Sequence, residues 1–183
     1  MTGLDERKAA LRALLKGQMP ADPEAASRSA QERLLQSGLL PATGVIALYR
    51  ALPSEVGTHL LAGALLARGA TLCWPRVAPG RVLEFRRAGT SWTRGPLRVE
   101  EPDGELVPLP LIEWMVVPAQ AADLRGHRLG RGKGYYDATL LAFPGRSVTL
   151  LFDLRVVAEV PSGVNDRRVD ALCTESRLVM VAQ

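Results

Sequence analysis

Residues 45–74 read VIALYRALPSEVGTHLLAGALLARGATLCW, and this stretch sets the architecture of the chain. Val45–Tyr49 is a short apolar run of β type, and residues 53–68 follow it with a helical pattern. Ala70–Trp74 is a second apolar run. Because a strand, a helix and a strand follow one another so closely, the stretch predicts a βαβ unit with two parallel strands.

The rest of the chain extends this unit into one domain. Residues 79–110 hold only loops and short strand candidates, and residues 118–134 form a long loop, so neither segment predicts a second domain. We therefore predict that residues 1–183 form a single-domain, three-layer α/β/α sandwich, Rossmann-like, around a mostly parallel sheet. The further elements expected are helices at 5–16, 22–37 and 135–142 and strands at 82–86, 114–117, 147–152, 172–173 and 178–181.

Composition narrows the class of protein. Of 183 residues, 47% are hydrophobic and 23% are charged, as is usual for a soluble globular domain. The net charge of +4 favours anionic ligands, but the arginines are scattered and only 5% of residues are aromatic, so we expect no nucleic-acid partner. No apolar run approaches the roughly 20 residues of a membrane span, and Asp5 and Glu6 do not suit a signal peptide. We therefore expect a cytoplasmic monomer without a membrane partner.

Cysteine and histidine offer little for metal or redox chemistry. Cys73 and Cys173 lie in apolar contexts, which predicts buried, inert thiols. His59 and His127 are too few to form a histidine-based metal site.

The most informative stretch for function is residues 126–137, GHRLGRGKGYYD. Its four glycines allow positive φ values and a close approach of the backbone to a ligand, so that successive N–H groups can point into one concavity. Arg128, Arg131 and Lys133 lie among the glycines and favour a polyanion, most often phosphate. The tyrosines that follow suit a helix start, whose dipole adds to the same field. The stretch is neither a P-loop nor a Gly-x-Gly-x-x-Gly motif, so its class stays open, and a flexible, solvated basic loop is the alternative.

Two loops are expected on the same edge of the sheet. In open parallel sheets, ligands bind outside the carboxyl ends of the strands. The glycine-rich loop follows the strand expected at 114–117, and the loop at 49–55, which carries Glu55, follows the strand at 45–49. Both loops are therefore candidates for the binding edge.

Four segments together resemble the 5-formyltetrahydrofolate cyclo-ligase family, also called the methenyltetrahydrofolate synthetases. They occur in the expected order and cover nearly the whole chain, and the run RLGRGKGYYD is highly specific. The segments are residues 8–12 (KAALR), 49–58 (YRALPSEVGT), 117–137 (from Val-Pro to that run) and 160–175 (from Val-Pro to Cys-Thr-Glu).

The resemblance implies a ligase that converts 5-formyltetrahydrofolate to 5,10-methenyltetrahydrofolate while splitting ATP to ADP and phosphate, with Mg²⁺. A formamide oxygen is a poor leaving group, and transfer of the γ-phosphoryl group onto it makes it a good one. N10 of the folate then attacks, and phosphate departs. Because phosphoryl transfer needs positioning and charge neutralisation, the cations of the glycine-rich loop, with Lys8 and Arg12, suit the reaction.

The resemblance also implies a role for each of several residues. Catalysis falls to Arg131, Lys133 and Tyr136. Mg²⁺ would be held, directly or through water, by Asp137 and by Asp166 in the run VNDRRVD. The ATP-binding set is Lys8, Arg12, Arg128, Gly130, Arg131, Gly132, Lys133, Gly134 and Tyr135. The substrate-binding set is Arg50, Glu55, Lys133, Gly134, Tyr135 and Tyr136.

Without the resemblance, most of these residues have a plainer interpretation. Lys8 and Arg12 would be a solvated helix face, and Glu55 a first-turn acid favoured by the helix dipole. Asp166 would cap a turn, and the tyrosines would be packing residues.

The chain also departs from the family pattern. Gly57 replaces an acid that usually lies two residues after Glu55, Ala122 replaces an aromatic residue expected on the loop wall, and Arg155 replaces a Gln. Arg50 and Arg155 are expected to add positive charge around the pocket. The alternative function is therefore an ATP- or phosphate-binding relative with the same fold that acts on a non-folate substrate or has lost turnover.

Overall fold

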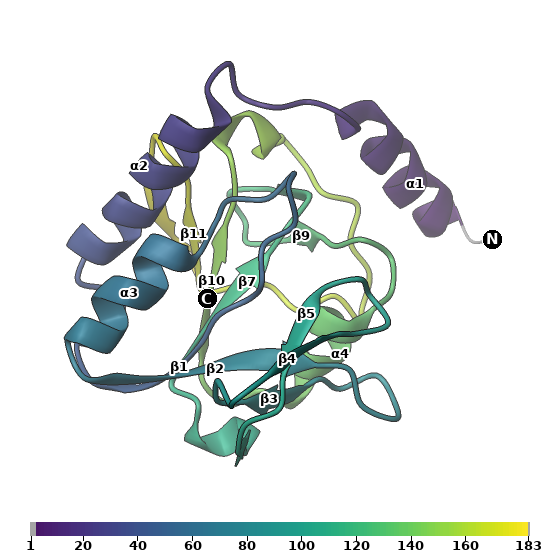
Figure 1. Ribbon diagram of the computed structural model, residues 1–183. Coiled ribbons are helices and arrows are strands. Elements are labelled where there is room, and N and C mark those ends of the chain that lie inside the picture. Colours follow the sequence, from purple (N-terminus) through teal and green to yellow (C-terminus); the bar gives the residue numbers. More distant parts are fainter. Residues whose placement is uncertain (1–2, 183) are drawn as a thin grey trace.

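A computed structural model describes residues 3–182 of the chain (Figure 1). Within these residues an eight-stranded sheet has the order β12-β11-β10-β7-β1-β2-β3-β6. The neighbouring strands β11 and β10, β10 and β7, β7 and β1, and β1 and β2 pair in parallel. The three outer pairs, β12 with β11, β2 with β3 and β3 with β6, are antiparallel. The prediction of a mostly parallel sheet is therefore confirmed. The strands are β1 (Gly44–Ala47), β2 (Ala70–Arg76), β3 (Glu84–Arg86), β6 (Leu106–Val107), β7 (Trp114–Pro118), β10 (Arg146–Leu150), β11 (Ala171–Cys173) and β12 (Leu178–Met180).

The predicted βαβ unit is present. Helix α3 (His59–Ala67) connects β1 and β2, and these strands pair in parallel from Gly44 opposite Ala70. The unit forms because both strands are apolar enough to be buried, with Ile46 and Ala47 fully enclosed.

The helix of this unit begins later than predicted, because residues 53–57 form a turn and not the first helical turns. The Tyr49 hydroxyl donates to the Val56 carbonyl at 2.6 Å, and the Leu52 amide donates to the Glu55 carboxylate at 2.9 Å. These side-chain bonds fix the backbone in a non-helical path. The prediction that a helix starts at Pro53 is therefore wrong, and Glu55 lies in a loop.

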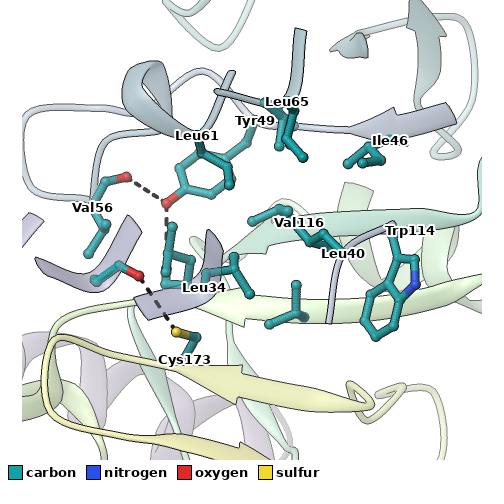
Figure 2. Close-up of a cluster of buried hydrophobic side chains, with 14 of the residues drawn as sticks. Leu34, Leu40, Ile46, Tyr49, Val56, Leu61, Leu65, Trp114, Val116 and Cys173 are labelled. Atoms are coloured by element: carbon teal, nitrogen blue, oxygen red, sulfur yellow. Dashed lines mark hydrogen bonds between the residues drawn. The ribbon is translucent and has the colours of Figure 1, made fainter. Parts of the chain in front are cut away.

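Helices cover both faces of the sheet. On one face, α2 (Pro23–Gln36) and α3 pack Leu34, Leu61 and Leu65 against strand residues such as Ile46 and Val116 (Figures 1 and 2). The opposite face belongs to α4 (Tyr135–Ala142), whose Leu140 packs with Met115 and Val117 of β7. Because successive strand residues point to opposite faces, these two clusters lie on the two sides of the sheet. The three-layer prediction is confirmed.

Helix α1 (Gly3–Leu15) lies apart from α2 and α3, across the molecule in Figure 1. Its Leu11 and Leu15 pack against Ala121, Leu129 and Val160 in a small cluster separate from the two main ones. The helix thereby reaches the segment that contains the glycine-rich loop.

The connections around β1 place a binding edge. From β1 the chain passes through α3 to β2 on one side, whereas β7, on the other side of β1, is followed by α4 and β10. The two connections lie on opposite faces of the sheet, so the carboxyl ends of β1 and β7 flank a topological switch point, where ligands bind in folds of this type.

The two irregular segments hold more structure than expected. Residues 79–110 contribute β3 and β6 to the sheet and form a separate hairpin of β4 (Trp92–Arg94) and β5 (Glu100–Pro102). Residues 118–134 contain a second small hairpin, β8 (Ala121–Ala122) with β9 (Arg128–Leu129). Short 3₁₀ turns occupy Leu109–Leu111 and Asp153–Arg155.

Cys73 and Cys173 are buried and unpaired, as predicted, and burial raises the pKa of each thiol to about 12. Between residues 3 and 182 there is no helix with the length and apolar character needed to cross a membrane.

Candidate functional site

A cavity of about 440 Å³ opens at the switch point. Its walls come from α1, from the loops after β1, β2 and β7, from the turn of the β4–β5 hairpin and from the start of α4. Every residue for which the sequence predicted a role lines it: Lys8, Arg12, Arg50, Glu55, Arg128, Gly130, Arg131, Gly132, Lys133, Gly134, Tyr135, Tyr136, Asp137 and Asp166.

The glycine-rich loop is held at both ends. Before it, the buried carboxylate of Asp123 accepts hydrogen bonds from the backbone amides of Arg125, His127 and Val160. Burial alone would raise the pKa of Asp123, but the hydrogen bonds from Val160 and His127 lower it below its usual value. The loop therefore starts from a turn fixed by a charged, fully enclosed carboxylate.

At its other end, the loop passes into α4. Gly132 and Gly134 have φ values of +87° and +74°, in the left-handed region that favours glycine. Gly134 is the N-cap of α4 and has no side chain to accept from the first amides of the helix. The amides at this helix start are therefore left without a side-chain cap at the cavity wall, as an anion site requires.

Helix α1 presents two cations to the cavity, and one of them contacts the loop. Arg12 Nε donates to the Gly130 carbonyl at 2.9 Å, and the same guanidinium lies over Gly132, where an added Cβ would be 3.4 Å from Arg12 Cζ. Lys8 Nζ binds both carboxylate oxygens of Asp166, at 2.6 and 2.8 Å, and both side chains are mostly buried. Lys8 and Arg12 are thus partnered at the cavity, and the interpretation as a solvated helix face does not describe them.

Arg128 is the most deeply buried cation of the cavity. Its side chain is 1% exposed, its Nη2 donates to Asp137 at 2.8 Å, and its guanidinium lies 5.7 Å from the ring centroid of Tyr136. Burial lowers the pKa of Arg128, whereas the charge of Asp137 opposes this shift. Arg128 Nε finds no hydrogen-bond partner among residues 3–182, so a buried donor is left for a ligand or solvent.

Arg131 faces the loop after β1. Its Nε donates to Glu55 at 3.0 Å and its Nη2 donates to Ser54 at 3.1 Å. Glu55 is 8% exposed and Arg131 is 43% exposed, so the pair lies at the boundary between cavity and solvent. The pair joins the two loops that the sequence placed on one edge.

Tyr136 keeps its proton over a wide pH range. Tyr136 is half-buried, and burial together with the charge of Glu55 raises its pKa, against the opposing effect of Arg128. A phenol in this position remains a hydrogen-bond donor at neutral pH.

Lys133 differs from the other cations of the loop. It is exposed, and within the described part of the chain no hydrogen bond or ion pair engages its ammonium group. It is the residue of the loop with a charge available to a ligand without breaking an existing contact.

The three departures from the family pattern all lie outside the lining of the cavity. Gly57 faces α3 and α2, since an added Cβ would lie 3.1 Å from His59 of α3 and 3.3 Å from Ser27 of α2. Ala122 packs in the core with Leu151 and Leu172, not on the cavity wall. These two positions therefore do not shape the cavity directly.

The third departure, Arg155, is buried and does not line the cavity. Its guanidinium donates to the carbonyl of Gln120 at 3.2 Å and to that of Gln18 at 2.8 Å. Arg155 thus links Gln18, in the connection between α1 and α2, to Gln120, in the segment after β7. Burial lowers the pKa of Arg155, and the charge of Arg131 lowers it further while that of Glu55 opposes the shift, so Arg155 adds positive charge close to these two cavity residues without lining the cavity.

Among residues 3–182, no group of three or more His, Cys, Asp or Glu side chains is arranged to hold a metal ion. Asp137 and Asp166 both line the cavity, and each is paired with one cation. Two carboxylates suit a Mg²⁺ ion whose remaining ligands are phosphate oxygens and water, which is how Mg²⁺ is usually held beside nucleotides.

Sequence reasoning missed several lining residues. Tyr49 is fully buried and holds the loop after β1 through its hydroxyl, although it read as the end of an apolar strand. Gln120 and the hairpin turn 96–99 also line the cavity. The weak pattern of residues 79–110 gave no sign that part of this segment folds over the site.

Known proteins resemble the chain over most of its length. The model of the 5-formyltetrahydrofolate cyclo-ligase family matches residues 4–175. A 5-formyltetrahydrofolate cyclo-ligase of Mycolicibacterium smegmatis is 30% identical over 93% of this chain and 94% of its own length. A probable 5-formyltetrahydrofolate cyclo-ligase of Schizosaccharomyces pombe is 26% identical over 73% of this chain and 76% of its own.

Solved structures agree with the sequence comparisons. The 5,10-methenyltetrahydrofolate synthetase of Aquifex aeolicus superposes with a TM-score of 0.78 at 26% identity, over 98% of this chain and 93% of that one. The synthetase of Mycoplasma pneumoniae superposes with a TM-score of 0.74 over 94% of this chain and 99% of that one. At 14% identity the second likeness bears on the fold alone.

Proposed function

Because the chain belongs to the 5-formyltetrahydrofolate cyclo-ligase family, we propose that its cavity converts 5-formyltetrahydrofolate to 5,10-methenyltetrahydrofolate while ATP is split to ADP and phosphate. The observation that carries this proposal is the convergence of all the residues predicted for the reaction on one cavity at the switch point of the sheet. These residues come from segments that are far apart in the chain, so the composition of a single loop does not explain why they meet in one cavity.

In the first step of the proposed reaction, the formyl oxygen attacks the γ-phosphorus of ATP, and ADP leaves. The oxygen thereby becomes part of a phosphate ester that can depart. The γ-phosphoryl oxygens carry the charge during this transfer, and preorganised cations that face them lower the barrier. We assign this role to Arg131 and Lys133, and ATP binding also to Lys8, Arg12, Arg128 and the backbone from Gly130 to Tyr135.

In the second step, N10 attacks the carbon of the formyl group, the ring closes, N10 loses its proton to the surrounding water, and phosphate leaves with the former formyl oxygen. The folate is proposed to contact Glu55, Tyr135 and Tyr136, with the Arg50 side of the cavity beside it. A protonated Tyr136 can donate a hydrogen bond to the formyl oxygen or to the phosphate that leaves with it, a role supported by its raised pKa.

We propose that Asp137 and Asp166 hold Mg²⁺ together with the phosphates of ATP. When bound, the ion would neutralise charge on the phosphate oxygens. The ion pairs with Arg128 and Lys8 keep both carboxylates at the cavity wall. We further propose that the protein acts as a cytoplasmic monomer on small-molecule substrates, without a nucleic-acid or membrane partner.

The test is to incubate purified protein with 5-formyltetrahydrofolate, ATP and Mg²⁺, and to follow the absorbance of the methenyl product together with ADP. We expect one ADP for each methenyltetrahydrofolate, and no ADP formation above background when folate is omitted. Tight ATP binding without methenyl product would favour a nucleotide-binding relative that has another substrate or no turnover.

A further inference from the structure

The β4–β5 hairpin forms part of the cavity although it stands outside the main sheet. Its strands pair only with each other among the described residues, from Trp92 opposite Pro102 to Arg94 opposite Glu100. The turn between them, residues 96–99, lines the cavity. The shape of this wall therefore depends on where the hairpin is held, and not on the sheet itself.

Arg50 connects the hairpin to the body of the protein. It follows β1 at the switch point, forms an ion pair with Glu100 of β5, and lies with its guanidinium 4.8 Å from the ring centroid of Trp92 of β4. Trp92 in turn packs edge-on against Trp74 of β2, with ring centroids 5.4 Å apart. One side chain thus contacts both strands of the hairpin.

A second anchor lies just after β2. The Glu101 carboxylate accepts from the Val77 amide at 3.1 Å and covers Gly95 at the start of the turn. This anchor fixes the β5 strand, whereas Arg50 secures the hairpin from the side of the β1 loop. Without Arg50, the Glu101 anchor would be the one polar contact left between residues 92–102 and the rest of the described chain, and the hairpin could tilt about it.

The part of the wall that the hairpin supplies suits the folate better than phosphate. Three of the four turn residues, Pro96, Leu97 and Val99, are apolar and join Val77 and Leu83 in the lining, whereas Arg98 and Glu101 are the charged residues that the hairpin adds to it. Apolar side chains of this kind pack against flat ring systems, while the charged phosphates of ATP are assigned to the glycine-rich loop. Displacement of the hairpin should therefore weaken folate binding more than ATP binding.

We propose that Arg50 is a positioning residue that tethers the β4–β5 hairpin over the folate side of the cavity through Glu100 and Trp92, and does not itself bind the substrate. This inference rests on the proposed function and refines the assignment of Arg50 to the substrate-binding set. The guanidinium is already engaged by a carboxylate and an aromatic ring, so binding a substrate anion would require it to leave both.

The kinetic test compares Arg50→Met, Glu100→Gln and the double variant. Both single variants should raise the KM for 5-formyltetrahydrofolate by about 3- to 10-fold, the range of an exposed ion pair with a cation–π contact, and should leave the KM for ATP within about twofold. The double variant should be no worse than the larger single effect, because both changes break the same tether. A matched control is Arg87→Met, which removes an exposed pair with Glu105 outside the cavity and should change neither KM.

Direct substrate binding by Arg50 gives a different pattern. Glu100→Gln would then free the guanidinium and leave the folate KM unchanged or lower it, while Arg50→Met would raise it. That outcome, or full additivity in the double variant, overturns the tether.

Hydrogen–deuterium exchange of residues 92–102 gives a readout without turnover. Arg50→Met should speed exchange in this segment severalfold in the ligand-free protein, with no change in α2. Unchanged exchange would overturn the tether. If the wild-type protein forms no methenyltetrahydrofolate, the proposed function fails, yet the exchange measurement still tells whether Arg50 holds the hairpin.

Discussion

Replacing Lys133 with Ala tests the phosphate role of the glycine-rich loop. Lys133 is exposed, lies between two glycines of positive φ, and has no hydrogen bond or ion pair among residues 3–182, so the substitution removes little packing. We expect the free energy of unfolding to change by less than about 0.5 kcal/mol. The fold is therefore kept while one charge is deleted.

The size of the catalytic effect follows from the position of this charge. A unit charge about 4 Å from a phosphate oxygen contributes roughly 1 kcal/mol in bulk water and roughly 4 kcal/mol near a partly enclosed surface. Lys133 is exposed in the ligand-free cavity and becomes more enclosed when ATP covers it, so we expect about 2.7 kcal/mol, or about 100-fold in turnover. The KM for ATP should rise as well.

The assay measures kcat and both KM values for the wild type, Lys133→Ala, Lys133→Arg and Lys16→Ala. Lys16→Ala is the matched control, because Lys16 is an exposed lysine just after α1 that does not line the cavity. Lys133→Arg should recover only part of the activity, since a planar guanidinium replaces a compact ammonium group. Near-normal turnover and ATP KM in Lys133→Ala would refute the view that this loop holds the phosphates.

Two further substitutions probe the neighbours of the loop. Glu55→Gln should lower folate turnover about 10- to 100-fold, because it removes one charge-assisted hydrogen bond of about 1.5–3 kcal/mol. The KM for ATP should stay the same or fall, because Arg131 is released from its ion pair. An equal loss in ATP binding would contradict the assignment of Glu55 to the folate side. Asp123→Asn should destabilise the protein by about 2 kcal/mol at pH 7, since it removes a buried charge that accepts several hydrogen bonds. The pKa of Asp123 is lowered in the folded state, so its contribution is present above the unfolded value of about 4 and is lost as pH falls through the folded value. In urea unfolding, the free energies of unfolding of the wild type and Asp123→Asn should therefore become equal at low pH. A difference between them that stays constant down to low pH would show that the charge of Asp123 does not contribute.

The fold was largely predictable because its central strands are short apolar runs that are separated by segments of helical length. The elements Ala70–Arg76, Trp114–Pro118 and Tyr135–Ala142 lie close to their predicted bounds. The helix expected at Pro53 failed for a tertiary reason, because Tyr49 and Glu55 bind backbone groups of this segment and hold it as a turn. A single sequence does not reveal that competition.

The site was predictable only in part. The glycine-rich loop carries a local signal, since its glycines and cations lie in one run, whereas the family resemblance was needed to bring in Lys8 and Asp166. The hairpin turn 96–99 lacks any chemical motif and reaches the cavity through the tether at Arg50. Long-range contacts of this kind depend on the folded chain, so pattern and spacing did not indicate them.

The central claim is that the γ-phosphoryl group of ATP passes to the formyl oxygen in this cavity, and an isotope experiment tests it most directly. 5-Formyltetrahydrofolate labelled with ¹⁸O in the formyl group is turned over with ATP and Mg²⁺, and the released phosphate is analysed by mass spectrometry. The account predicts one ¹⁸O atom in each phosphate released, and one such phosphate for each methenyltetrahydrofolate formed. Methenyl product accompanied by unlabelled phosphate, with the label in water, would contradict it.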